Sequence, residues 1–111
     1  MGRGMGMAAL RVLKAVEAGA EYGFDIIDAT GLPGGTVYPA LSRLERDGLV
    51  TSSWEAVTIA REEGRPPRRY YEATKAGVSA LNDALEHLHA LKPIRGARPG
   101  GGVNVNLKAR S

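Results

Sequence analysis

The chain has 111 residues, a formal net charge of +3 and no cysteine. This length supports one domain with a modest core but not an enclosed enzyme cleft beside a second domain, and the missing cysteines exclude disulfides, thiolate metal sites and cysteine nucleophiles. No apolar run approaches the length of a membrane span, and the first ten residues lack the apolar core of a signal peptide, so we expect a soluble, cytoplasmic protein without membrane contacts.

The positive charge is unevenly distributed along the chain. Four basic residues and no acidic residue follow Pro93, so residues 1–92 hold 11 basic against 12 acidic groups, a net charge of −1. Segment 93–111 is rich in glycine and has no apolar period, which predicts a flexible basic tail, although its VNVNL run could also pair as an edge strand. Any basic surface in the body of the chain must therefore be local.

Two amphipathic stretches open the chain. Residues 7–18 place apolar side chains on one helical face before Gly19, which predicts a core helix. Residues 21–30, EYGFDIIDAT, predict a second, shorter helix that ends at Gly31. We expect that second helix to bury Phe24, Ile26 and Ile27.

The stretch 32–49, LPGGTVYPALSRLERDGL, predicts the helix around which the chain is organised. One stripe of this helix is apolar and must be buried, and it consists of Val37, Ala40, Leu41 and Leu44. The opposite arc offers hydroxyls and guanidiniums suited to phosphates and base edges, and it holds Thr36, Pro39, Ser42, Arg43 and Arg46, with Tyr38 on its flank. Because proline fits cleanly only in a first turn, the helix should start near Gly35 or Thr36, or bend at Pro39, and end at Gly48.

The connection between the second and third helices has the length of a helix-turn-helix turn. Two short helices joined in this way, the second with a polar and basic outer face, are typical of proteins that lay a helix in the major groove of DNA. The alternative for the third helix alone is a solvated surface helix of a small α+β domain.

After Gly48, residues 49–54 (LVTSSW) and 68–73 (RRYYEA) predict two antiparallel strands. The polar segment 55–67 between them predicts a long loop with a Gly-Arg-Pro-Pro tip, and the whole hairpin resembles a wing. We expect Arg65, on this stiff loop, and Arg68 to meet phosphates or a narrow minor groove, with a plain solvated loop as the alternative.

The last predicted helix runs from Lys75 to about Leu91, with Thr74 as its N-cap. Apolar residues recur along this helix at alternating spacings of three and four and form one stripe. A chain this small cannot easily cover that stripe, so we expect a second copy of the chain to cover it. His87 and His89 are two residues apart and point away from each other, so they do not form a metal-binding pair.

Several short motifs, in order, resemble the PadR family of winged-helix transcriptional regulators over about residues 7–92. They are YGFDI at 22–26, GTVYPAL at 35–41, RLE at 43–45, DGLV at 47–50, and Gly64-Arg65 through Arg69-Tyr70-Tyr71 to Thr74 and Gly77. The resemblance implies a homodimeric repressor that binds an inverted-repeat operator and is often released by a small hydrophobic ligand. Trp54 is the one local residue that suits such a ligand, because its ring could stack on a small aromatic effector, and the alternative for Trp54 is a core role. Phe24 departs from the family, which usually has a tyrosine there, the wing is longer than in many members, and the C-terminal helix is short.

We therefore predict a mostly α fold with a small β-hairpin: a winged helix-turn-helix DNA-binding domain at 1–73, a dimerisation helix at 74–92 and a flexible basic tail at 93–111. The expected function is sequence-specific DNA binding in transcription regulation, without catalysis, metal or cofactor, and the alternative is a winged-helix module that binds a protein partner. The candidate DNA contacts are Tyr22, Thr36, Tyr38, Pro39, Ser42, Arg43, Arg46, Arg65 and Arg68. The candidate dimer contacts are Leu10, Val78, Leu81, Leu85 and Leu88.

Overall fold

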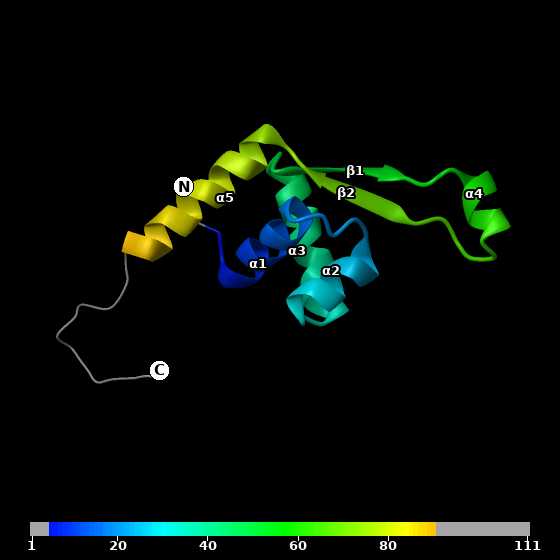
Figure 1. Cartoon of the computed structure of the whole chain (residues 1–111), viewed down its shortest axis with the longest axis horizontal. Helices are drawn as coiled ribbons and strands as arrows, with labels where there is room; N and C mark the ends of the chain where they lie inside the picture. The colour runs from blue at the N-terminus through cyan, green and yellow to red at the C-terminus, as the bar shows by residue number, and fades with distance from the viewer. Residues whose placement is uncertain (1–4, 91–111) are drawn as a thin grey trace.

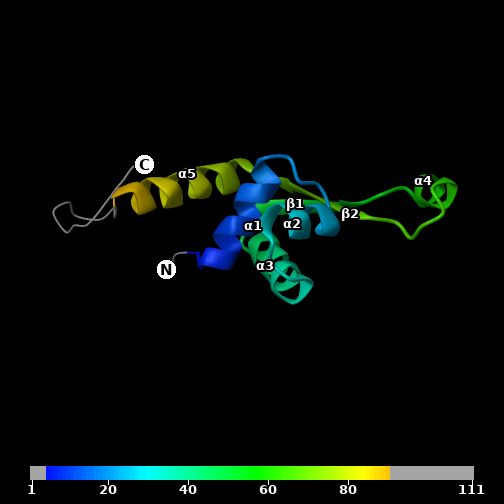
Figure 2. The ribbon, with the colours of Figure 1, turned by 60° about the horizontal axis from the view of Figure 1, so that its bottom comes forward.

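The computed structural model describes residues 5–90, so the predicted tail and its possible edge strand lie outside the described residues. Three helices form the body, and a hairpin and a fifth helix leave it in opposite directions (Figures 1 and 2). The elements in chain order are α1 (Met7–Glu17), α2 (Gly23–Thr30), α3 (Gly34–Arg46), β1 (Val50–Trp54), α4 (Val57–Glu62), β2 (Arg69–Ala73) and α5 (Lys75–Ala90). This arrangement is the predicted mostly helical fold with a two-stranded antiparallel hairpin. Within residues 5–90, no helix is both long enough and apolar enough to cross a membrane.

The core lies where α1 packs against α3 and α2 closes one side. The predicted stripe of α3 is buried there against Val12 and Leu13 of α1 and Ile26 of α2. Val50, at the start of β1, and Leu81 of α5 complete the same core. The helical spacing of apolar residues therefore fixes which face of α3 points inward and, by exclusion, which face meets solvent.

The turn between α2 and α3 is held by one buried threonine. The Thr30 hydroxyl donates to the Ile26 carbonyl at 2.7 Å and accepts from the Leu32 N–H at 3.1 Å, while the Thr30 carbonyl accepts from Arg11 Nη2 at 3.0 Å. Gly31 follows with φ of +73°, a left-handed conformation that glycine adopts without steric cost. These bonds fix the direction in which α3 leaves α2.

The hairpin pairs β1 with β2 over five residue pairs, from Val50 opposite Ala73 to Trp54 opposite Arg69. The chain before α2 adds to the free edge of β2, because Tyr22 forms a β-bridge with Tyr70 and the Tyr71 N–H donates to the Glu21 carbonyl at 2.8 Å. Strand β2 is thereby attached to the chain before α2 on one edge and to β1 on the other.

Helix α5 begins at the predicted N-cap. The Thr74 hydroxyl accepts from the Gly77 N–H at 2.9 Å and donates to the Gly48 carbonyl at 2.7 Å, which ties the helix start to the end of α3. A Cβ at Gly77 would overlap the Leu49 carbonyl oxygen, so the glycine permits this close approach.

Three expectations about local structure were wrong. Phe24 is 72% exposed rather than buried, because α2 begins at Gly23 and its first turn lies at the edge of the body. The chain at Tyr22 is extended, with φ of −140° and ψ of 174°, since it pairs with β2 instead of starting the helix. The loop at the wing tip contains the short helix α4.

Helix α3 begins at Gly34, one residue before the expected range, so Pro39 lies in the second turn. Because proline has no N–H, Pro39 cannot donate the helical hydrogen bond to the Gly35 carbonyl. Both residues are exposed, so water can donate to that carbonyl instead. The helix ends as expected, with Gly48 at φ of +78°.

Candidate nucleic-acid interface

The outer face of α3 gathers most of the predicted DNA contacts. Ser42, Arg43 and Arg46 are exposed, as is Pro39, and Thr36 is half-buried beside them. The two arginine side chains are 55% and 72% exposed, and their only ion pairs within residues 5–90 are contacts of 3.9–4.0 Å with Asp47. Exposed pairs of this length contribute little, so both guanidiniums can turn toward an anionic partner.

Tyr38 lies on the flank of that face and bridges two helices. Its ring packs so closely over Gly23, the first residue of α2, that a Cβ at Gly23 would overlap the Tyr38 hydroxyl. The side chain is nevertheless exposed over almost half its surface. Tyr38 therefore has a position fixed by α2 and an open side next to the α3 arginines.

Tyr22 and Arg68 meet each other rather than α3. The Arg68 guanidinium lies 4.0 Å from the centroid of the Tyr22 ring, a cation–π distance, and Tyr22 meets Tyr70 edge to face with centroids 5.8 Å apart. This stack joins the wing to the start of α2. The structure therefore places these two predicted contacts at the junction of wing and helix-turn-helix.

Arg65 is not the free cation that the sequence suggested. It forms a two-pronged ion pair with Glu55, with Nη1–Oε1 at 2.6 Å and Nη2–Oε2 at 2.9 Å, and the side chains are 24% and 6% exposed. The Arg68 N–H also donates to Glu55 at 3.1 Å, and the Glu55 N–H donates to the Arg68 carbonyl at 2.8 Å. The hydrogen bond from Arg65, helped by the Arg68 N–H, lowers the pKa of Glu55 to about 2 despite its burial.

Glu55 therefore joins the two ends of the loop that contains α4, and its ion pair occupies the Arg65 guanidinium. Nothing in the local spacing of the sequence indicates this contact, which spans ten residues. The exposed surface of the tip carries Arg61, Glu62 and Glu63, so the tip is not basic. Phosphate binding by the tip, as expected for Arg65, does not fit this geometry.

Sequence reasoning missed a cluster where the wing meets α3. Arg69 donates from Nε to Ser52 Oγ at 3.0 Å and forms an ion pair of 3.3 Å with Glu45 of α3, while the Ser52 hydroxyl donates to Glu45 Oε2 at 2.7 Å. The Trp54 ring lies beside Arg69, with its centroid 5.5 Å from the guanidinium carbon, and is 65% exposed. The core alternative for Trp54 is therefore wrong.

The apolar stripe of α5 divides into two parts. Leu81 is 2% exposed and belongs to the core of this chain, so it is not available to a second copy. Val78, Leu85 and Leu88 are 36–40% exposed. Leu88 also lines a groove of about 780 Å³ between the start of α1, the end of α3 and α5, whose rim includes Arg43 and Arg46. Leu10 of α1 is 8% exposed and lines the same groove.

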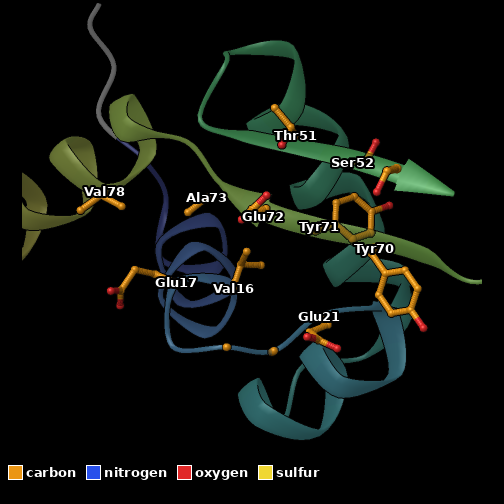
Figure 3. A pocket seen from close by; sticks show the side chains of 13 residues that line it. Val16, Glu17, Glu21, Thr51, Ser52, Tyr70, Tyr71, Glu72, Ala73 and Val78 are labelled. Carbon is orange, nitrogen blue, oxygen red and sulfur yellow. The ribbon is translucent and has the colours of Figure 1, made fainter. Parts of the chain in front are cut away.

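A second hollow, of about 810 Å³, lies between the end of α1, the chain before α2 and the hairpin (Figure 3). Tyr70 and Tyr71 lie along one side of it, and burial raises the pKa of Tyr71. Its lining includes Glu17, Glu21 and Glu72 but no basic side chain, so it is electrostatically unsuited to nucleic acid.

Comparison with known proteins gives a consistent result. Residues 12–83 match the family described as "Transcriptional regulator PadR-like family". The Transcriptional regulator Rv3488 of Mycobacterium tuberculosis is 49% identical over 57 residues, which are 49% of this chain and 48% of that protein, so the match spans about half the length of this relative. A PadR-like transcription factor from Bacteroides fragilis superposes with a TM-score of 0.67 at 29% identity, over 77% of this chain and 82% of that one. A PadR family transcription regulator from Clostridium difficile R20291 superposes with a TM-score of 0.68 at 25% identity, over 78% of this chain and 92% of that one.

Proposed function

This chain belongs to the PadR-like family of transcriptional regulators, and from that premise we propose that it is a homodimeric repressor that binds an inverted-repeat DNA operator through α3. The observation that carries the proposal is the outer face of α3, where exposed hydroxyl and guanidinium groups lie opposite a fully buried stripe. Such a face can enter the major groove without exposing any core residue.

In this proposal different residues of α3 contact the bases and the backbone of the DNA. Arg43, near the middle of the exposed face, is the candidate for a two-pronged contact to a guanine, and Ser42 and Thr36 contact neighbouring base edges or phosphates. Arg46, at the end of the helix, and Tyr38, fixed by α2, contact the backbone and set the register. Tyr22 and Arg68 support this surface by holding the wing against α2.

A second copy covers the exposed part of α5. Val78, Leu85 and Leu88 form the apolar contact, and the groove between α1 and α5 receives the partner's helix. A two-fold pairing of this kind presents two copies of α3 to one side of the DNA, about 34 Å apart, which matches half-sites separated by one helical turn. Because Arg43 and Arg46 are among the residues that line the groove, a partner helix in it also lies beside the end of α3.

The small aromatic effector expected at Trp54 stays a prediction. The exposed ring offers a ligand one open face, whereas most small-molecule sites enclose their ligand. Release from DNA by phenolic compounds would support such an effector.

Binding to a duplex taken from upstream of the protein's own gene, compared with a scrambled duplex of equal length, tests the proposal. Fluorescence anisotropy at 150 mM salt should show binding at least about a thousandfold tighter to the gene-flanking duplex, the ratio typical of specific regulators. If neither duplex is bound at any salt concentration, the proposal is contradicted and the alternative, a module that binds a protein partner, is favoured.

A further inference from the structure

The hairpin carries a polar and aromatic cluster on the face that looks toward α3. The register pairs Trp54 with Arg69 and Ser52 with Tyr71, so these four side chains share one face of the hairpin. Val50 lies on the same face and is buried in the core, whereas Trp54, four residues along, is exposed. This face therefore begins in the core and emerges into solvent on the same side as α3.

Two of the three guanidinium nitrogens of Arg69 are held by neighbouring side chains. Nε donates a hydrogen bond to Ser52 of β1 and Nη2 donates to Glu45 in the last turn of α3, whereas Nη1 has no hydrogen-bond partner within the described part of the chain. The Arg69 side chain is 41% exposed. Because a guanidinium carries five N–H donors in a rigid fork, this network fixes the group and still leaves the donors of Nη1 free for an outside acceptor.

We propose that Arg69 and Trp54 form a second DNA contact, in which Nη1 of Arg69 donates to a backbone phosphate and the Trp54 ring packs on the adjoining deoxyribose. The inference rests on the proposed function of α3 and extends its surface onto the hairpin through Glu45. The fixed donor of Arg69 suits a phosphate, and an exposed ring beside it suits the apolar face of a sugar. The wing tip is a poorer candidate, since it carries Glu62 and Glu63.

The same geometry gives Glu45 and Ser52 a positioning role. A long arginine side chain loses rotamer freedom on binding, and a network that orders it beforehand reduces that cost. The ion pair also connects the wing to α3, so it holds the Arg69 guanidinium beside the end of α3.

The test uses the fact that Trp54 is the only tryptophan of the chain, so its fluorescence reports this position alone. The full chain is titrated with a fluorescently labelled duplex from upstream of its gene, and anisotropy of the label confirms binding. Acrylamide quenching of Trp54 should be strong in the free protein and should fall at least about twofold in the complex, because packing against DNA excludes solvent from the ring. Binding with unchanged quenching would overturn this inference and leave the role of α3 standing, whereas absence of binding would overturn both.

Variants give a second readout. Arg69→Gln should make the dependence of log affinity on log salt shallower by about 0.9, the value of one lost phosphate contact, whereas Arg61→Gln, a matched change on the exposed tip, should leave that slope unchanged. Trp54→Ala should lower the affinity for DNA about fivefold or more, and Trp54→Phe should retain part of the affinity that the alanine variant loses. Equal slopes for the Arg69 and Arg61 variants would contradict the phosphate contact.

Discussion

Leu85→Asp tests the proposed dimer most sharply. Burying a whole leucine side chain contributes about 1.5–3 kcal/mol. Leu85 is 38% exposed in the single chain, so covering this exposed part in the dimer contributes about 1 kcal/mol in each protomer by the same scale. Aspartate at this place also puts an unpartnered polar group into an apolar contact, at a cost of about 1–3 kcal/mol. Since two-fold symmetry applies both effects twice, the dimer should weaken by about 4–8 kcal/mol, a thousandfold or more in Kd.

Sedimentation velocity at micromolar concentration measures the effect directly. The wild type should sediment as a dimer and Leu85→Asp as a folded monomer whose affinity for gene-flanking DNA falls far more than its weak non-specific affinity. Ser79→Asp is the control, because it adds the same charge on α5 a third of a turn away from the apolar stripe. A wild type that is monomeric at this concentration while it binds that DNA specifically, or a Leu85→Asp protein that remains dimeric, would refute the reasoning.

Three further changes test the fold that supports this surface. The pKa of Glu55 falls from 4.5 to about 2 on folding, so the stabilisation from its pair with Arg65 should be complete above about pH 4.5 and lost as the pH falls toward 2. The fluorescence of Trp54, the single tryptophan, should change in that window. Fluorescence that stays constant between about pH 5 and 2 would contradict this pairing. Thr74→Ala should lower the free energy of unfolding by about 1 kcal/mol, because the N-cap of α5 is lost, whereas Thr74→Ser should retain most of it in urea denaturation. Gly23→Ala should displace the Tyr38 ring and weaken DNA binding while the circular dichroism spectrum is unchanged, and unaltered affinity would remove Tyr38 from the interface.

The helices could be predicted from sequence because their periodicity reflects a core that is local in the chain. The stripe on α3 is buried as expected, and the Thr74 cap and the Gly48 terminus follow from residue chemistry that does not depend on distant contacts. Leu81 shows the limit of this reasoning. A periodic stripe indicates which residues of α5 are apolar, but only the position of the body decides that Leu81 enters the core while Leu85 stays at the surface.

The wing was predicted less well, because its structure depends on contacts across many residues. Helix α4 consists of six residues, VTIARE, whose β-branched members favour strands, and it forms inside a loop that the Glu55–Arg65 pair closes. Arg68 and Arg69 are neighbours of the same type. Which of them faces α3 follows from the strand register, and the predicted strand limits, 49–54 and 68–73, do not by themselves set that register.

The central claim, that the outer face of α3 reads base pairs, is tested most directly by measuring Arg43→Ala against a set of duplexes that each carry one base-pair substitution in the bound site. If Arg43 contacts a guanine, wild-type binding should lose about 1–3 kcal/mol on substitution of one base pair in each half-site, and the Arg43→Ala protein should be indifferent to that pair while it keeps its preferences elsewhere. Arg43→Ala weakening that is equal on every duplex, with the wild-type preferences intact, would contradict base reading by Arg43 and reduce its role to a phosphate contact.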